Sequence, residues 1–278
     1  MANKNMPVIS DYDMQLFIRI AKHGFIDMEY IYRFLYLNKK KRTIDDRINQ
    51  LSLHNFLASY TTFAPAEYTA SGRRGFKVIT LGIEGVKLMR FYEYSVIDNL
   101  AALKCSSPYR MYHQVQLSMV CDTLREKYKE NNLYDVYKIF NERECINDVV
   151  TMQPDALILF KPKDKSKDYC VAVFVEIERS YASQMRIDKK LQSYALAIRK
   201  EVYNQKFKEK IIMSRVLFVS QTKSQFNMVM EKAKVSEYAN NIDVLCVSYQ
   251  NLVEDPLGSN YKGLDDKEYK LLSKLEKQ

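Results

Sequence analysis

The chain has 278 residues, 47% of them hydrophobic and 28% charged, with a formal net charge of +9, so one large domain or two ordinary ones are expected. None of its seven glycines lies within residues 86–257. This excludes a phosphate-binding loop in that range, because such loops need glycine so that the backbone can approach the phosphate closely. Three widely spaced histidines and five scattered cysteines exclude a histidine-built zinc site and predict reduced thiols in a cytoplasmic protein without a signal peptide.

The first third of the chain has the pattern of three short helices. Apolar residues at helical spacing predict a helix over Asp11–Lys22, ended by Gly24, and a second helix from Asp27. Thr43 is expected to open the third helix, with Asp46 as its capping-box partner. The outer faces of this third helix carry polar side chains, namely Arg42, Arg47, Asn49 and Gln50.

A predicted hairpin follows the third helix. Two extended stretches, Leu57–Phe63 and Phe76–Thr80, flank a tip that contains Arg73 and Arg74 between glycines, and a closing helix is expected around Val86–Tyr94. Three helices, a basic hairpin and a closing helix form a winged helix-turn-helix pattern. In that pattern the third helix offers its polar side chains to the major groove, while the two arginines contact phosphate or the minor groove. The alternative is a helical protein-interaction module whose arginine tip is solvated.

The excess positive charge is concentrated in the same region. Residues 1–95 contain 14 Lys and Arg against 9 Asp and Glu. A basic domain suits a polyanionic partner. We therefore expect a winged-helix DNA-binding domain over residues 1–100, with double-stranded DNA as its ligand.

After a linker near Leu103–Pro108, strands and helices alternate. The expected elements are helix His113–Lys129, strands Tyr134–Phe140, Asp155–Phe160 and Val171–Glu178, helix Gln184–Lys206, strand Arg215–Ser220, helix Ser224–Tyr238 and strand Ile242–Ser248. This order predicts an α/β domain over residues 108–255, followed by a charged tail over 256–278 with a last helix rich in lysine and glutamate. No apolar run approaches the roughly 20 residues needed to cross a bilayer, so we expect no membrane association.

The third strand of this domain carries two carboxylates on one face. Side chains alternate along a strand, so Glu176 and Glu178 point to the same side. Neighbouring like charges that are half-buried need a compensating cation. If the strand that begins at Asp155 pairs beside this one, three carboxylates converge, and such an oxygen cluster suits Mg²⁺ or Mn²⁺ acting on a phosphodiester. The alternative is a Glu-x-Glu pair at a strand end that faces solvent.

Pro154-Asp155 followed by Glu176-Ile177-Glu178, in this strand order, resembles the PD-(D/E)xK restriction-endonuclease-like core. The resemblance implies that Asp155 and Glu176 hold metal. Glu178 stands where that motif has lysine, so either Glu178 is a further metal ligand and the lysine role has moved, or the site is weakened. At 100° per residue, Lys190 falls at the edge of the inward stripe of the next helix, whereas Lys189 points into solvent. Lys190 is thus the candidate for the moved lysine, which would orient the water or stabilise the transition state.

Three further titratable residues of the expected second domain have two interpretations each. His113, at the head of the second domain, either binds phosphate or packs structurally, and the structural role is favoured. Glu142 and Glu144 either add a fourth carboxylate or are loop charges.

The whole arrangement is similar to the replication-relaxation family of Gram-positive mobile elements and to MobC-type plasmid relaxases. The resemblance covers roughly Asp11 to Tyr249 and rests on His113-Gln114-Val115, Pro154-Asp155, Glu176-x-Glu178 and Lys190–Tyr194. It implies an α+β protein, a winged helix followed by a nuclease-like domain, that nicks an origin of transfer or replication with Asp155, Glu176, Glu178 and Lys190. A homodimer and other mobilisation or replication proteins stay open as partners. The alternative is a non-catalytic replication accessory or transcriptional regulator with a degenerate nuclease domain.

Overall fold

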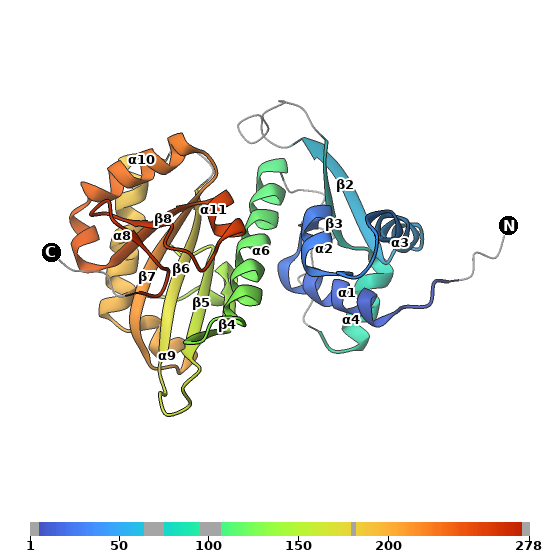
Figure 1. Cartoon of the computed structure of the whole chain (residues 1–278), viewed down its shortest axis with the longest axis horizontal. Coiled ribbons are helices and arrows are strands. Elements are labelled where there is room, and N and C mark those ends of the chain that lie inside the picture. The colour runs from blue at the N-terminus through green and yellow to red at the C-terminus, as the bar shows by residue number, and fades with distance from the viewer. Residues whose placement is uncertain (1–5, 64–74, 95–106, 179–181, 274–278) are drawn as a thin grey trace. The chain divides into compact units, whose positions relative to one another are not determined.

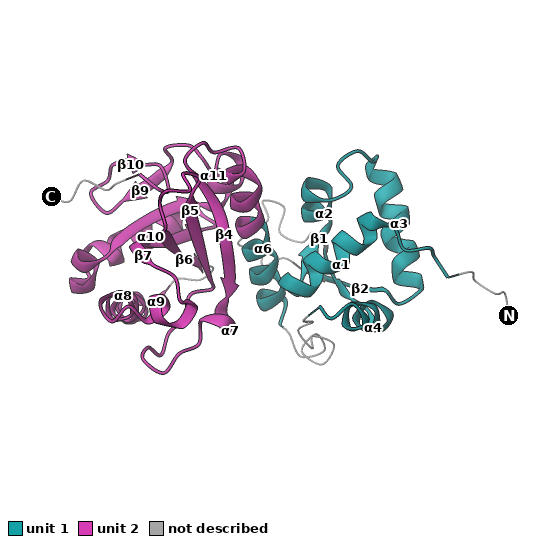
Figure 2. Ribbon diagram, turned by 90° about the horizontal axis from the view of Figure 1, so that it is seen from below, with its two compact units in different colours: residues 1–119 teal, residues 120–278 magenta. Residues whose placement is uncertain are grey.

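The structure is a computed structural model that describes residues 6–63, 75–94, 107–178 and 182–273. It divides into two compact units, residues 1–119 and 120–278 (Figure 2). The boundary lies inside helix α6 (Pro108–Tyr128), whereas the sequence pattern placed the linker before that helix. Within the described ranges, no helix is both long and apolar enough to cross a membrane.

The first unit combines helices with a three-stranded antiparallel sheet (Figure 1). Its elements before α6 are α1 (Asp11–His23), β1 (Ile26–Asp27), α2 (Met28–Phe34), α3 (Lys41–Leu53), β2 (Leu57–Phe63), β3 (Gly75–Leu81) and α4 (Ile83–Phe91). The strand order is β1-β3-β2, and β2 pairs with β3 from Leu57 opposite Leu81 to Phe63 opposite Gly75. The predicted hairpin strands are therefore present, while the tip with Arg73 and Arg74 lies outside the described residues.

Helix α1 has the boundaries that its sequence predicts. Ser10 caps the helix by accepting from the backbone N–H of Asp13, and Asp13 accepts in return from the Ser10 N–H. Gly24 ends the helix with a φ of 82°, a left-handed value that glycine adopts without a steric cost.

Helix α3 begins earlier than expected. It starts at Lys41, and its N-cap, Lys40, makes no side-chain cap hydrogen bond. The backbone N–H of Ile44 already bonds to the Lys40 carbonyl, so the first turn is formed before Thr43. The predicted Thr43–Asp46 capping box was therefore wrong, because both residues lie inside the helix.

The second unit is built on a seven-stranded mixed sheet, so the chain as a whole is a mixed α+β protein. After α6 its elements are β4 (Tyr134–Asn141), α7 (Glu142–Cys145), β5 (Ala156–Pro162), β6 (Cys170–Glu178), α8 (Gln184–Arg199), α9 (Val202–Phe207), β7 (Ile211–Ser220), α10 (Lys223–Lys234), the 3₁₀ turn η2 (Glu237–Asn241), β8 (Asp243–Ser248), α11 (Tyr249–Glu254), β9 (Tyr261–Gly263) and β10 (Glu268–Tyr269). The strand order is β10-β9-β8-β7-β6-β5-β4. Strands β4, β5 and β6 run antiparallel, and β6, β7 and β8 run parallel through crossovers that contain α8 and α10.

Strand β6 lies in the interior of this sheet, between β7 and β5, and is buried along its whole length. Helices α8 and α10 share one hydrophobic core with the face of β6 that carries Phe174 (Figure 1). The rings of Phe174 and Tyr194 on α8 stack with centroids 5.0 Å apart. Glu176 and Glu178 belong to this same face by strand alternation, so α8 is the element placed to meet them.

Two predictions for the second unit were wrong. The helix expected over 184–206 ends at Arg199, and Glu201 takes a left-handed φ of 51° before α9 starts a new helix. The segment expected as a charged tail contributes β9 and β10 to the sheet, and the described part of it contains no final helix. Its apolar side chains, Tyr261 and Leu271, are fully buried, which accounts for its docking on the sheet.

Candidate active site

The carboxylates predicted from the sequence lie at one end of strands β5 and β6. Asp155 immediately precedes β5, and the antiparallel register places Ala156 opposite Val175, so Asp155 reaches the level of Glu176. One Asp155 oxygen, Oδ2, accepts a hydrogen bond from the backbone N–H of Ile177 at 2.7 Å. The pairing of β5 with β6 that the sequence analysis required is therefore present.

Helix α8 brings the ammonium group of Lys190 to both glutamates. Lys190 Nζ donates to Glu176 Oε2 at 2.6 Å and also to Glu178 Oε1. The exposed fractions are 3% for Glu176, 1% for Glu178 and 4% for Lys190, whereas Lys189 is exposed. The cation that this buried pair needs is thus Lys190, at the helix position that the periodicity had singled out.

Tyr194, also on α8, is a further member of the cluster. Its ring is in the core, but its hydroxyl donates to Glu176 Oε1. The sequence signal for this contact was the position of Tyr194 four residues after Lys190. Residues four apart share a helix face, and Lys190 was already predicted to point toward Glu176. Both Glu176 oxygens are therefore bonded, one to Lys190 and one to Tyr194.

The electrostatics of the cluster favour an added proton or cation. The pKa of Glu176 is raised to about 7, mainly because burial disfavours its charged form; the charge of Lys190 lowers the pKa and that of Asp155 raises it. Burial lowers the pKa of Lys190, but the adjacent carboxylates of Glu176 and Glu178 outweigh this and raise it overall. Three carboxyl groups face one ammonium group in a mostly buried site, so a proton on Glu176 reduces the negative charge there.

The expected three-carboxylate metal site requires a correction. Within the ranges that the structure describes, no group of three His, Cys, Asp or Glu side chains is arranged to hold a metal ion. Glu178 bonds to Lys190, as Glu176 also does, and is not arranged with Asp155 and Glu176 as a third ligand. The two remaining carboxylates suit Mg²⁺ or Mn²⁺ only as part of a shell completed by water and phosphate oxygens, which is a common arrangement for Mg²⁺.

The other titratable residues considered in the sequence lie in other elements. Glu144 is exposed and accepts from the backbone N–H of Asn141 at 2.8 Å, as part of a capping box at the start of α7. Glu142 is exposed in the same short helix. His113 lies within α6, in the part of that helix that belongs to the first unit.

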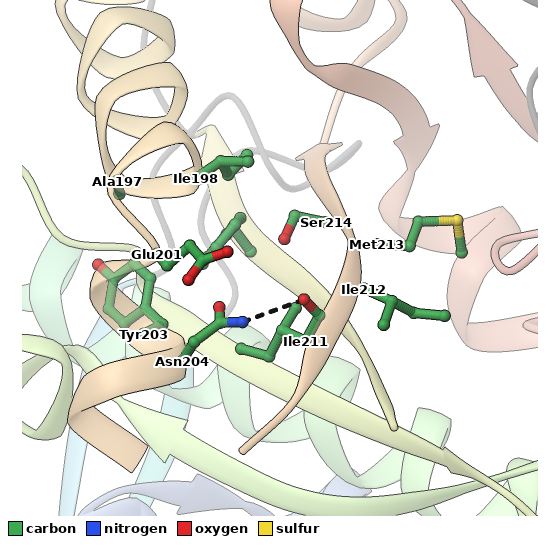
Figure 3. Close-up of a pocket in the computed structure, with 10 residues that line it drawn as sticks. Ala197, Ile198, Glu201, Tyr203, Asn204, Ile211, Ile212, Met213 and Ser214 are labelled. Atoms are coloured by element: carbon green, nitrogen blue, oxygen red, sulfur yellow. Dashed lines mark hydrogen bonds between the residues drawn. The ribbon is translucent and has the colours of Figure 1, made fainter. Parts of the chain in front are cut away.

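A pocket of about 220 Å³ lies between α8, α9 and the beginning of β7 (Figure 3). Its lining includes Glu201, Tyr203, Asn204 and Ser214. Ser220, which pairs with Glu178, is at the other end of β7. The lining also includes Phe174, which lies two residues before Glu176 on β6, so one wall of the pocket extends toward the carboxylates.

The residues predicted to bind DNA divide into two groups. Arg42, Asn49 and Gln50 are exposed on α3. Arg47 is bound within the unit instead, because its Nε and Nη2 atoms donate to the buried Asp13 at 3.1 and 2.6 Å and Nη2 also donates to the Val8 carbonyl at 2.6 Å. A direct DNA contact through Arg47 is therefore withdrawn.

A run of cations at the start of α3 was not among the predicted DNA-binding residues. Lys39, Lys40 and Lys41 are exposed and continue into Arg42. The signal was visible in the sequence as four consecutive basic residues. This run lies at the start of the helix that carries Asn49 and Gln50.

Comparison with known proteins gives a weak structural similarity. No protein-family model matches the chain, and no curated protein matches it. The restriction endonuclease FokI aligns with 12% identity and a TM-score of 0.34, covering 87% of this chain and 41% of FokI. FokI bound to DNA aligns with 14% identity and a TM-score of 0.28, covering 86% and 43%. The chain spans less than half the length of these structures, and at these TM-scores the similarity adds no argument about function.

Proposed function

We propose that this chain is a DNA-processing protein that binds double-stranded DNA through its first unit and cuts one strand with the acidic cluster of its second unit. The observation that carries the proposal is the meeting of Asp155, Glu176, Glu178 and Lys190 at one end of β6. Stability alone is a weak reason to bury a lysine and two carboxylates, since apolar residues of similar volume serve as well or better. Perturbed ionisable groups of this kind are typical of functional sites.

Each residue has a defined part in the proposed reaction. Asp155 and Glu176 would hold Mg²⁺ or Mn²⁺, which when bound lowers the pKa of water and offsets charge on the scissile phosphate. The Ile177 N–H fixes one Asp155 oxygen, and the Tyr194 hydroxyl fixes one Glu176 oxygen. Lys190 is buried, so we assign it a positioning role, in which it holds Glu176 and Glu178 together against their mutual repulsion.

The first unit supplies the DNA-binding surface in this proposal. Its order of helices and its hairpin agree with a winged helix-turn-helix, in which α3 enters the major groove. The basic run from Lys39 to Arg42 would contact phosphates, while Asn49 and Gln50 would reach base edges. Binding of this kind weakens as salt is added, because each phosphate contact releases counterions.

The more specific role, a relaxase that nicks an origin on a mobile element, rests on the short sequence motifs alone. The test is incubation of supercoiled plasmid that carries the cognate origin with the full chain and Mn²⁺. The proposal predicts conversion to the nicked circle by the wild type but not by Asp155→Ala. Equal plasmid relaxation by the two proteins, or none by either, would contradict the nickase.

A second candidate function is a DNA-binding replication accessory or regulator that does not cut. Two observations favour it: Glu178 stands at the usual lysine position, and Lys190 already bonds both glutamates. This candidate predicts sequence-specific DNA binding without any Mn²⁺-dependent cleavage. The same plasmid experiment, with DNA binding measured alongside, separates the two functions.

A further inference from the structure

We infer that Gln50 determines base specificity by presenting its amide N–H donors to the DNA, so that the chain selects a base with major-groove acceptors, guanine foremost. The inference rests on the proposed function, in which α3 binds DNA, and it deepens that function by assigning which chemical group of which side chain reads the base. Gln50 is exposed on α3, so its outward group is accessible to a ligand.

The orientation of the Gln50 amide follows from its neighbour one turn earlier in the helix. Arg47 Nη1 donates to Gln50 Oε1 at 2.5 Å. A guanidinium group has only donors, so the amide must turn its oxygen, and never its nitrogen, toward Arg47. The Nε2 amino group, on the other side of the amide carbon, is then directed away from Arg47.

Arg47 can hold this orientation because it is itself anchored. Its other nitrogens donate to Asp13 and to the Val8 carbonyl. Asp13 is fully buried and also accepts from the Tyr36 hydroxyl at 2.7 Å. A buried carboxylate thus fixes the arginine and the arginine fixes the glutamine, which reduces the conformational entropy that a free glutamine would lose on binding.

The neighbouring amide on α3 is oriented in the same sense. Lys77 Nζ, on β3, lies 3.5 Å from Asn49 Oδ1 and donates to it. An ammonium group also has only donors, so Asn49 is held by its oxygen and its amino group is turned away from Lys77. Two exposed side-chain amides on the same helix, those of Asn49 and Gln50, are therefore both held by their oxygens and both turn their N–H donors away from the protein group that holds them.

Donors in this position select among the bases. In the major groove guanine presents two acceptors, N7 and O6, and thymine presents O4, whereas cytosine presents the N4 amino donor. The pairing of glutamine with adenine uses both the amide oxygen and the amide nitrogen. Because the Gln50 oxygen is engaged by Arg47, that pairing is disfavoured and guanine offers the most acceptors.

The experiment is a binding selection from a random duplex oligonucleotide library, carried out with the full chain and with Gln50→Ala, Gln50→Glu and Gln15→Ala. Gln15 is an exposed glutamine on α1 and serves as the matched control. The wild type and Gln15→Ala should prefer guanine over each other base at one position by about five-fold or more. Gln50→Ala should lose the enrichment at that position only, and Gln50→Glu, which turns an acceptor outward, should shift it toward cytosine. Because Gln50 is exposed, all variants should keep the thermal unfolding midpoint of the wild type.

The outcomes distinguish the inference from the proposed function. If the wild type selects no DNA, the proposed function and the inference both fail. If the wild type selects a site and Gln50→Ala selects the same site with the same base frequencies, the inference fails and DNA binding stands. A wild-type preference for cytosine at the position that Gln50 controls would also overturn it.

Discussion

Removing the ammonium group from the acidic cluster is the sharpest test of how the second unit is held together. In Lys190→Met, Glu176 and Glu178 would stay buried at 3% and 1% exposure with no cation between them. Breaking a buried pair by removing one partner costs about 3–5 kcal/mol, because an uncompensated charge is left behind. Glu176 limits this cost by taking up a proton, since its pKa is already raised to about 7. We therefore expect a loss of about 3 kcal/mol at pH 8 and a smaller loss at pH 6.

The assay is urea unfolding of the full chain followed by circular dichroism at the two pH values. Lys189→Met is the matched control, since the neighbouring lysine is exposed and its substitution should change the unfolding free energy by no more than about 0.5 kcal/mol. Adding Glu178→Gln to Lys190→Met should recover part of the loss by removing one of the orphaned charges. Equal stability of Lys190→Met and Lys189→Met, or a loss that does not depend on pH, would refute the charge-compensation account.

Two further predictions concern the pH dependence of stability and the DNA-binding surface. The pKa of Glu176 is raised in the folded chain, so the folded state binds more protons than the unfolded state. The unfolding free energy should therefore fall as pH rises from 4.5, the ordinary pKa of glutamate, through about 7. In Glu176→Gln, urea unfolding should show a smaller dependence of the unfolding free energy on pH, and an identical pH dependence in the variant would assign the effect to other groups. For the first unit, Lys40→Ala and Lys41→Ala should each weaken DNA binding about equally for all DNA sequences. Each should also reduce the slope of log affinity against log salt concentration by about 1, measured by fluorescence anisotropy with a labelled duplex. An unchanged slope would show that these lysines do not contact phosphates.

The sequence was informative wherever the relevant geometry is local. Strand alternation put Glu176 and Glu178 on one face, and the 100° rotation per residue of a helix put Lys190, and not Lys189, toward them. Both inferences need only the backbone period of one element, together with the assumption that the two elements pack. The structure brings these three side chains into direct contact.

The features that were missed depend on contacts between distant parts of the chain. Arg47 reads as an exposed helix residue in the sequence, and only its pairing with Asp13, on another helix, shows that it is an internal anchor. Strands β9 and β10 are three and two residues long, too short to give a periodic pattern in the sequence. They form because Tyr261 and Leu271 are buried against the rest of the unit. Likewise, the left-handed backbone conformation at Glu201 could not be predicted, because the residue that commonly signals it, glycine, is not present there.

Strand cleavage with matched variants of the same site decides whether the acidic cluster cuts DNA. Supercoiled plasmid would be incubated with the wild type, Asp155→Asn and Glu176→Gln in Mn²⁺ or EDTA, with the folding and DNA binding of each protein measured in parallel. The account predicts nicked circles only with the wild type in Mn²⁺, and intact DNA with both variants although they still bind it. Cleavage that persists in Glu176→Gln, or DNA binding by the wild type without any Mn²⁺-dependent nicking, would contradict the assignment of this cluster as a nuclease site.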